Sequence, residues 1–298
     1  MHLKNVVVLS VNDIMDHTLQ RIKGERTRGE FCWTCTSVII EYVLQTYNEK
    51  MCTYVDADIF FFANPKDIIQ EIIDDQCAVG LVEHRFERNA LYGKEIFRNG
   101  KYCIQFNTFM NNNEGRKVLK DWKEQCLEWC YGRREDGRFG DQKYPDRWKM
   151  RYSCVHVSTC LGAGVAPWNL HVYTNIRQKD GKVFMNFKDR PFPVLFYHYE
   201  GMQYLDAHRI YLNLWKYSEI GTKRKVNVLY GTYFIYIERI RKILKDSYGI
   251  TFDHMIADQR QYLGGKHSVI NFCKEQGLIN GIREWLGYCK NNVFTIHT

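Results

Sequence analysis

The chain has 298 residues, 45% of them hydrophobic, which is enough for one sizeable core with a smaller appendage. Its formal net charge of +8 permits attraction to phosphate or an anionic membrane surface, but no basic stripe or zinc-finger spacing indicates nucleic-acid binding. The cysteines are scattered, the N-terminal apolar run is too short for a secretory leader, and no apolar stretch approaches the length of a membrane span. We therefore expect a cytoplasmic protein with free thiols.

Strand and helix patterns alternate along the chain up to residue 203. The predicted strands are 3–11, 53–64, 78–82, 101–110, 152–157 and 194–199, with a hairpin around Asp180-Gly181. The predicted helices are 12–24, 25–47, 66–74 and 114–130. This alternation predicts an α/β fold with a mixed, mainly parallel sheet flanked by helices.

After residue 203 the strand patterns stop, and basic residues and helical periods dominate to the end. We therefore predict a first domain at 1–203 and a helical C-terminal region at 204–298. Residues 226–245 mix aromatic and basic side chains, and the basic run Lys223, Arg224 and Lys225 precedes them. This helical region could lie on a membrane surface, and the alternative is a helical cap packed on the main domain.

Two aspartates, Asp56 and Asp58, interrupt the apolar segment 53–64. Residues i and i+2 of a strand lie on one face, so both carboxylates could reach a single cation. Hard divalent ions such as Mg²⁺ and Mn²⁺ prefer oxygen ligands and also bind a diphosphate. The alternative is a solvated pair of aspartates capping the turn before Pro65.

Asn107 and His198 also lie at or near the ends of predicted strands. Ligands of open α/β sheets bind beyond the carboxyl ends of strands, so these side chains are expected near Asp56 and Asp58. An imidazole can complete a carboxylate site for Mn²⁺. The alternative for His198 is a core histidine satisfied by the backbone.

Two further stretches could have a catalytic or ligand-binding role, but each is a weak indication by itself. Asp141-Gln142 after a glycine could cap a short helix or take part in a reaction. Gly162-Ala163-Gly164 could let the backbone approach a phosphate closely, although no phosphate-loop lysine accompanies it.

Taken in order, these stretches resemble the nucleotide-diphospho-sugar transferases, which are GT-A-type glycosyltransferases related to family 8. The similarity covers roughly residues 5 to 205. The matching stretches are Glu-Arg-Thr-Arg-Gly-Glu-Phe-Cys-Trp-Thr (25–34), Tyr-Val-Asp-Ala-Asp-Ile-Phe-Phe-Phe (54–62), Gln-Phe-Asn-Thr-Phe (105–109), Glu-Asp-Gly-Arg-Phe-Gly-Asp-Gln-Lys-Tyr (135–144), Gly-Ala-Gly-Val-Ala-Pro-Trp-Asn (162–169) and Phe-Tyr-His-Tyr-Glu-Gly (196–201). Each motif by itself is a weak indication of this family, but all six in the family's order are a specific one.

The resemblance implies a GT-A-like fold and a metal-bound donor diphosphate. Asp56 and Asp58 would hold Mn²⁺ or Mg²⁺, with His198 as a further ligand, and the metal would act as a Lewis acid on the leaving nucleoside diphosphate. Arg26 and Arg28 would form the basic group near the donor, because a guanidinium suits phosphate oxygens.

The resemblance also assigns roles to the remaining residues. It implies donor binding by Asn107, Thr108, Gly162 and Gly164, catalysis by Asp141 and Gln142, and a sugar-stacking face on Trp168. If transfer inverts the sugar, Asp141 could be the general base for the acceptor hydroxyl. If transfer retains it, no strong nucleophile is evident, and front-face attack aided by the leaving diphosphate is the easier route.

The expected function is therefore transfer of a sugar from a nucleoside-diphosphate-sugar to an acceptor hydroxyl, as in polysaccharide biosynthesis. The acceptor would be a glycan, a lipid-linked molecule or a protein, with no nucleic-acid partner. One alternative is a degenerate nucleotide-sugar-binding protein without turnover. Another is a haloacid-dehalogenase-type phosphatase, in which Asp56 would be the nucleophile and Gly140-Asp141 with Asp146 the later motif.

Members of this family usually begin with a strand, a helix and a second strand before the equivalent of residues 6–9. The present sequence starts after that unit, which contributes to the nucleotide-base site in the family. We therefore expect a complete metal end of the donor site and an incomplete nucleoside end. We also expect an exposed or irregular sheet edge near residues 5–10.

Overall fold

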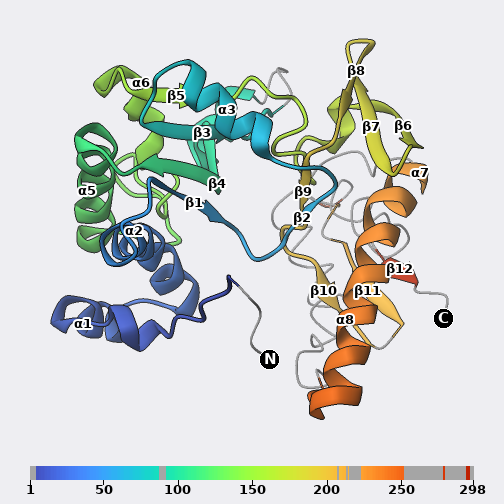
Figure 1. Cartoon of the computed structure of the whole chain (residues 1–298), viewed down its shortest axis with the longest axis horizontal. Helices are drawn as coiled ribbons and strands as arrows, with labels where there is room; N and C mark the ends of the chain where they lie inside the picture. The colour runs from blue at the N-terminus through green and yellow to red at the C-terminus, as the bar shows by residue number, and fades with distance from the viewer. Residues whose placement is uncertain are drawn as a thin grey trace. The chain divides into compact units, whose positions relative to one another are not determined.

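The chain divides into two compact units in its computed structural model (Figure 1), which describes residues 5–86, 92–206, 208–212, 214, 223–251, 278 and 293–295. The first unit consists of Met1–Ala57 and Pro65–Cys160, and the second of Asp58–Asn64 and Leu161–Thr298. The division passes between Ala57 and Asp58, so the Asp-x-Asp motif joins one unit to the other.

The first unit contains a four-stranded sheet in the order β1-β4-β3-β5 (Figure 1). Its strands are β1 (Met51–Val55), β3 (Val79–Glu83), β4 (Tyr102–Met110) and β5 (Val155–Val157). β4 runs antiparallel to both β1 and β3, and β3 pairs with β5 in parallel. The expectation of a mainly parallel sheet is therefore wrong for the described strands, while the mixed α/β class is confirmed.

The helices of the first unit begin and end where local sequence signals place them. They are α1 (His17–Glu25), α2 (Arg28–Thr46), α3 (Lys66–Asp74), α4 (Tyr92–Asn99), α5 (Asn113–Glu128) and α6 (Trp148–Arg151), with 3₁₀ turns at Val11–Ile14 and Tyr144–Arg147. Thr27 and Glu30 form a capping box at the start of α2, and the side chain of Asn112 caps α5. The helices predicted at 25–47, 66–74 and 114–130 are confirmed.

The core of the first unit lies between this sheet and its helices. The rings of Phe109, Trp122 and Trp148 meet there, with the planes of Phe109 and Trp122 stacked at a centroid distance of 5.9 Å. Large aromatic side chains bury more apolar surface per residue than aliphatic ones, so these three contribute strongly to the hydrophobic stabilisation of this unit.

The strand predicted at 3–11 is wrong for the residues that the structure describes. Residues 5–10 form no strand, and Val6, Val7 and Val8 are 56%, 64% and 90% exposed. Within the described residues no strand pairs with this segment, and an apolar run forms a buried strand only where a partner covers it. Asp16 caps α1, which therefore starts later than the predicted helix 12–24.

The described part of the second unit contains three small sheets. β2 (Ile59–Phe61) pairs with β9 (Phe196–His198), and β6 (Thr174–Lys179), β7 (Lys182–Phe187) and β8 (Arg190–Pro193) form an antiparallel meander. The third sheet contains β10 (Gln203–Tyr204), β11 (Arg209–Tyr211) and β12 (Val293–Thr295). The hairpin predicted around Asp180-Gly181 is confirmed as the β6–β7 turn.

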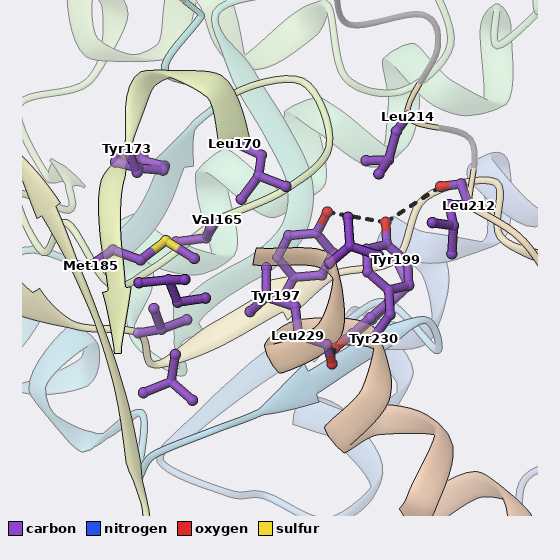
Figure 2. Close-up of a cluster of buried hydrophobic side chains, with 14 of the residues drawn as sticks. Val165, Leu170, Tyr173, Met185, Tyr197, Tyr199, Leu212, Leu214, Leu229 and Tyr230 are labelled. Carbon is purple, nitrogen blue, oxygen red and sulfur yellow. Dashed lines mark hydrogen bonds between the residues drawn. The ribbon is translucent and has the colours of Figure 1, made fainter. Parts of the chain in front are cut away.

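The described helical segments of the second unit contribute side chains to the same core as these strands. They are a 3₁₀ turn at Leu170–Val172, α7 (Lys223–Val226), a π-helical segment at Asn227–Gly231, and α8 (Thr232–Tyr248). Figure 2 shows Leu229 and Tyr230 of the π-helical segment among the buried side chains of this core.

The helical C-terminal region expected at 204–298 contains α8, and it also contains the strands β11 and β12, which were not predicted. The proposed boundary at residue 203 stays a prediction, because much of the second part lies outside the described residues. Within the described part of the chain, none of the helices combines the length and the apolar character needed to cross a bilayer.

Candidate metal centre and its polar surroundings

Asp58 and His198 are brought together by the pairing of β2 with β9 in the second unit. Ile59 lies opposite His198, and the amide of Tyr199 donates a 2.8 Å hydrogen bond to the carbonyl oxygen of Asp58. The imidazole Nε2 of His198 lies 3.0 Å from Oδ1 of Asp58. The predicted pairing of these two side chains is therefore set by the backbone register of a short antiparallel ladder.

The protonation state of Asp58 suits a metal ligand. Burial by itself raises the pKa of this carboxyl, but the hydrogen bond and the charge of His198 outweigh it and lower the pKa below its usual value. The carboxylate is thus ionised at neutral pH. His198 is 6% exposed, whereas the side chain of Asp58 is 45% exposed, so the carboxylate has room for a further partner.

Asp56 directly follows β1 in the first unit. Its amide donates to the carbonyl oxygen of Gln105 at 3.1 Å, and the hydroxyl of Tyr54 donates to its Oδ1 at 2.7 Å. Burial and then the charge of Asp56 raise the pKa of Tyr54 far above its usual value, so the phenol stays a hydrogen-bond donor. Tyr54 was not predicted as a site residue, although its position two residues before Asp56 places both on one strand face.

Asp56, Asp58 and His198 form a possible metal-binding group around the Asp-x-Asp segment. One ligand atom from each residue lies within 4.8 Å of the others. Two carboxylates and an imidazole fit Mn²⁺ well, whereas Mg²⁺ prefers an all-oxygen set. The residues present therefore fit a divalent cation, and the chemistry of the donor atoms favours Mn²⁺.

Asn107 lies on the same sheet face as Tyr54, because the two residues are opposite each other in the β1–β4 ladder. Its side chain is 0% exposed, and neither amide atom has a hydrogen-bond partner within the described residues. Buried amides are nearly always paired, so this group is able to take a hydrogen-bonding partner such as a ligand or a water molecule. Thr108 lies on the opposite face, where its hydroxyl is 2.9 Å from that of Thr53.

Asp141 is buried in the first unit and carries a strongly shifted carboxyl. Burial raises its pKa, and the charge of Asp56 adds to this, giving a pKa of about 8 against an ordinary 3.8. Its carbonyl oxygen accepts a hydrogen bond from Nε1 of Trp122 at 3.1 Å. The adjacent Gln142 is used differently, since its Nε2 donates to the carbonyl oxygen of Asn99 at 2.7 Å.

The two arginines predicted near the donor have different surroundings. Arg26 is buried, and its guanidinium donates to the carbonyl oxygens of Cys126 and Leu127 at 2.7 and 2.9 Å. A cation at the C-terminus of α5 satisfies orphan carbonyls and complements the helix dipole, so Arg26 has a structural role. Arg28 is the exposed first residue of α2 and keeps its charge toward solvent.

The glycine loop of the second unit supports β9. A Cβ on Gly162 would lie 2.1 Å from the carbonyl oxygen of Pro193, so this close approach requires glycine. Gly164 has a φ of +72°, and its carbonyl oxygen accepts from Nδ2 of Asn169 at 2.9 Å. The ring of Trp168 meets His198 edge-on at 5.3 Å and is buried, so Trp168 positions the imidazole.

Comparison with known proteins gives relatives but no functional class. No family model matches the chain. The chain is 26% identical over 239 residues to the Uncharacterized protein YfnD of Bacillus subtilis (strain 168), covering 79% of this chain and 73% of that protein. It is 29% identical over 214 residues to the Uncharacterized protein YfnF of the same organism, covering 70% and 68%. The relatives share much of the chain, and their names state no activity.

Proposed function

We propose that the protein is a metal-dependent glycosyltransferase that moves a sugar from a nucleoside-diphosphate-sugar to an acceptor hydroxyl. The observation that carries this proposal is the convergence of ligand atoms from Asp56, Asp58 and His198 within 4.8 Å of one another. A cation bound there would neutralise the diphosphate and act as a Lewis acid on the leaving group. The motif resemblance supplies the substrate class.

The chain's own residues have distinct tasks in this proposal. Asp58 is held as a carboxylate by His198, and Asp56 is oriented by the hydroxyl of Tyr54. The orphaned amide of Asn107 would hydrogen-bond hydroxyl groups of the donor sugar, which removes the energetic cost of leaving it buried and unpaired.

Asp141 is better suited to donating a hydrogen bond than to accepting a proton at neutral pH. With a pKa of about 8, its carboxyl is largely protonated at pH 7. A protonated carboxyl can hold a donor or acceptor hydroxyl in place. Front-face attack assisted by the leaving diphosphate needs no protein base, so it is compatible with a protonated Asp141.

The GT-A-like architecture and the cytoplasmic location are parts of the same proposal. The position of Asp56 at the end of β1, which β4 flanks, supports the first. The described cysteines are free thiols, several of them buried, which supports a reducing compartment.

The phosphatase alternative has less support from the geometry. Asp146, the later aspartate that this mechanism needs, accepts hydrogen bonds from the amide of Lys101 at 2.6 Å and from Nζ of Lys143 at 2.8 Å. These contacts fix it in a structural role at the start of β4. The pairing of His198 with Asp58 also has no task in that mechanism.

A donor screen tests the proposal. Purified protein is incubated with Mn²⁺ and each common nucleoside-diphosphate-sugar, and release of nucleoside diphosphate is measured with and without a chelator. We expect one donor to be consumed only with metal, and Asp58→Ala to lower the rate by about 100-fold or more, because a Lewis-acid metal contributes several kcal/mol. Asp67→Asn, an exposed aspartate of α3, is the matched control and should retain the wild-type rate.

Other outcomes separate the alternatives. Consumption of no donor, or full activity of Asp58→Ala, would refute the transferase proposal. Mn²⁺-dependent binding of a nucleotide-sugar without turnover would identify a binding protein instead. Hydrolysis of an aryl phosphate through a phosphorylated Asp56 would identify the phosphatase.

A further inference from the structure

His198 lies between two buried tyrosines on β9. Tyr197 is 0% and Tyr199 is 1% exposed, and both belong to the core of the second unit. Since successive strand residues point to opposite faces, the face that receives the two tyrosines determines that His198 points the other way, toward Asp58. The orientation of the imidazole therefore depends on what holds Tyr197 and Tyr199.

The two tyrosine rings are held by the beginning of the C-terminal helix. The ring of Tyr230 lies 5.5 Å from that of Tyr197 and 5.0 Å from that of Tyr199, and the ring of Tyr233 stacks on Tyr199 at 3.9 Å. We call these four residues, Tyr197, Tyr199, Tyr230 and Tyr233, the tyrosine clamp. Edge-on and stacked aromatic pairs of this kind contribute beyond the area they bury.

Hydrogen bonds give the tyrosine clamp a fixed geometry. The hydroxyls of Tyr197 and Tyr230 are 3.1 Å apart, and the hydroxyl of Tyr230 donates to the carbonyl oxygen of Leu212 at 3.3 Å, as Figure 2 shows. The hydroxyl of Tyr199 donates to the carbonyl oxygen of Leu229 at 2.9 Å. Each of these three buried phenols thus has a specific partner, which rigidifies the cluster.

The carbonyl oxygen that receives Tyr199 belongs to the π-helical segment. Leu229 and Tyr230 both lie in Asn227–Gly231, where the helix is wider than an α-helix. π-Helical segments are rare in proteins, but those that occur are often found at functional sites, because the irregular turn changes the direction of side chains and backbone groups. Here the irregular turn presents a carbonyl oxygen and a phenol to β9 together.

We propose that the tyrosine clamp is a positioning element that fixes His198 against Asp58 and thereby sets the affinity of the metal centre. β2 and β9 are three residues each, and a two-stranded pair of that length is only marginally stable by itself. The contacts of the clamp supply the missing rigidity from outside the ladder. This inference rests on the proposed metal-dependent function and gives the helix after residue 223 a task in it.

The influence of Asp58 on Tyr233 agrees with this arrangement. Burial, followed by the negative charge of Asp58, raises the pKa of Tyr233 to about 12. The first turn of α8 therefore lies within electrostatic range of the candidate ligand. Groups that orient metal ligands from behind typically change metal affinity 10–100-fold when they are removed.

Mn²⁺ titrations followed by electron paramagnetic resonance test the proposal on the full chain. Tyr199→Phe and Tyr230→Phe each remove one hydroxyl and keep the ring, and we expect about 3–10-fold weaker Mn²⁺ binding because the clamp acts through His198. Val183→Ala is the control, since Val183 belongs to the same core but lies on β7, outside both the tyrosine clamp and the β2–β9 ladder. It should lower the melting temperature and leave Mn²⁺ affinity unchanged.

A clamp with a merely structural role would give the opposite pattern. Lower melting temperatures for both tyrosine variants with wild-type Mn²⁺ affinity would overturn the proposal. So would an affinity loss in Val183→Ala equal to that of the tyrosine variants. Asp58→Asn removes a proposed ligand and should abolish Mn²⁺ binding, which verifies that the titration measures this site.

A metal-free readout separates this inference from the proposed function. In protein labelled with ¹³C at histidine Cε1, the His198 resonance is identified by its loss in His198→Asn. We expect one sharp line in the wild type and a broadened or split line in Tyr199→Phe. An unchanged line in the variant would overturn the clamp, even if the wild type bound no Mn²⁺ and the metal-centre proposal had failed.

Discussion

The hydroxyl of Tyr54 donates a 2.7 Å hydrogen bond to Oδ1 of Asp56. The two residues lie on one face of β1 and its C-terminal extension, so the contact follows from the period of the strand. Because burial and the charge of Asp56 keep Tyr54 protonated, the phenol is a permanent donor to this carboxylate. The hydroxyl of Tyr54 therefore helps to fix the orientation of this candidate metal ligand.

Tyr54→Phe should therefore weaken Mn²⁺ binding by about tenfold, because the ligand loses the group that orients it. Tyr47→Phe, at an exposed position after α2, is the control and should bind Mn²⁺ like the wild type. Isothermal titration calorimetry measures both. Equal affinities for the wild type and Tyr54→Phe would show that the hydroxyl does not position Asp56.

Asp141 should make stability fall as the pH rises. Its folded pKa of about 8 lies above the ordinary 3.8, so between these values the native state keeps a proton that the unfolded state releases. The unfolding free energy therefore decreases with rising pH across this window. Asp141→Asn removes the ionisable group and should be more stable than the wild type by about 1–3 kcal/mol at pH 8.

Urea unfolding in the presence of a chelator, at pH 5 and pH 8, measures this difference. We expect the advantage of Asp141→Asn to be clearly larger at pH 8 than at pH 5. An advantage that is constant with pH would show that Asp141 titrates normally. Asp136→Asn, at an exposed loop position, makes the same chemical change away from the core and is the matched control.

The side chain of Asn107 should lower the stability of the free protein and contribute to ligand binding. Its amide is fully buried and lacks a partner within the described residues, which costs about 1–3 kcal/mol. Asn107→Leu is close in volume and should raise the unfolding free energy by about 1 kcal/mol. The same variant should lose the thermal shift that a donor nucleotide-sugar gives the wild type. A destabilised Asn107→Leu would indicate that the amide is satisfied in solution.

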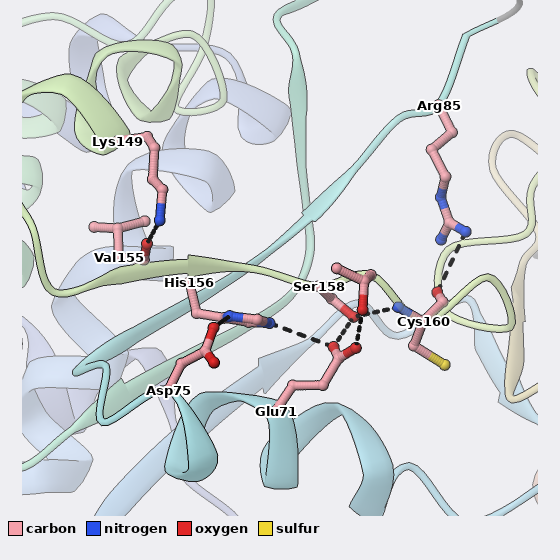
Figure 3. A network of polar contacts seen from close by, with 9 residues as sticks. Glu71, Asp75, Arg85, Lys149, Val155, His156, Ser158 and Cys160 are labelled. Atoms are coloured by element: carbon pink, nitrogen blue, oxygen red, sulfur yellow. Dashed lines mark hydrogen bonds and ion pairs between the residues drawn. The ribbon is translucent and has the colours of Figure 1, made fainter.

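A polar network joins α3 to β5 in the first unit (Figure 3). His156 contacts Asp75 through Nδ1 at 2.7 Å and Glu71 through Nε2 at 3.4 Å. The hydroxyl of Ser158 donates to Glu71 at 2.6 Å, and Thr159 donates to the same carboxylate. Burial alone would raise the pKa of Glu71, but these hydrogen bonds lower it below its usual value.

Glu71→Gln should destabilise the protein by about 1–2 kcal/mol at pH 7, because hydrogen bonds to a carboxylate are stronger than those to an amide. The depressed pKa means that this stability is present above the ordinary value of 4.5 and is lost as the pH falls through the folded pKa. Chemical unfolding at pH 7 and pH 4 should therefore show a difference that shrinks in acid. Asp67→Asn on the same helix provides a control with no network.

The basic run Lys223, Arg224 and Lys225 is not suited to a test of membrane association by charge neutralisation. Lys225 is buried, and its Nζ donates to the carbonyl oxygen of Leu170 at 3.0 Å, so neutralising it would disturb the core. α8 instead exposes Ile240 and Ile243, and basic residues of the same helix lie close to them. An exposed apolar stripe flanked by cations is typical of helices that bind anionic membranes.

The triple variant Arg239→Gln, Lys242→Gln, Lys245→Gln should lose co-sedimentation with vesicles that contain phosphatidylserine at low salt. The matched control changes three exposed lysines of the first unit, Lys66, Lys117 and Lys120, and therefore removes the same charge. If the wild type does not sediment, the helix is a cap on the protein's own core. If both variants lose binding equally, net charge is responsible instead of α8.

Local chemistry was sufficient to predict the helices and much of the metal group. Thr27 with Glu30 and Asn112 are capping signals that act within one turn, so α2 and α5 lie close to their predicted positions. Asp56 and Asp58 are joined by a single residue, so their proximity was a property of the sequence. His198 was expected near them because it lies at the end of a predicted strand and because of the order of the motifs, and the contact that holds it against Asp58 depends on strand pairing between distant segments.

The predictions of a strand at 3–11 and of a mainly parallel sheet were wrong for a nonlocal reason. A strand exists only with a partner, and the direction of pairing depends on segments far apart in the chain, as for β1 and β4. The same reason hid the structural role of Arg26, whose partners at Cys126 and Leu127 lie about a hundred residues away.

The sequence by itself determined which groups the candidate site can offer: two carboxylates one residue apart, an imidazole, an amide and a further carboxyl, because residue types and short spacings define which ligands are possible. The single strand predicted over 53–64 is wrong, because β1 ends at Val55, β2 begins at Ile59, and Asp56 and Asp58 lie in the connection between them. Only the tertiary structure decided how these groups are held. The contact of Tyr54 with Asp56, the shifted pKa of Asp141 and the tyrosine clamp behind His198 all depend on burial and on pairing between distant segments. Those properties are set by packing, which no local pattern encodes.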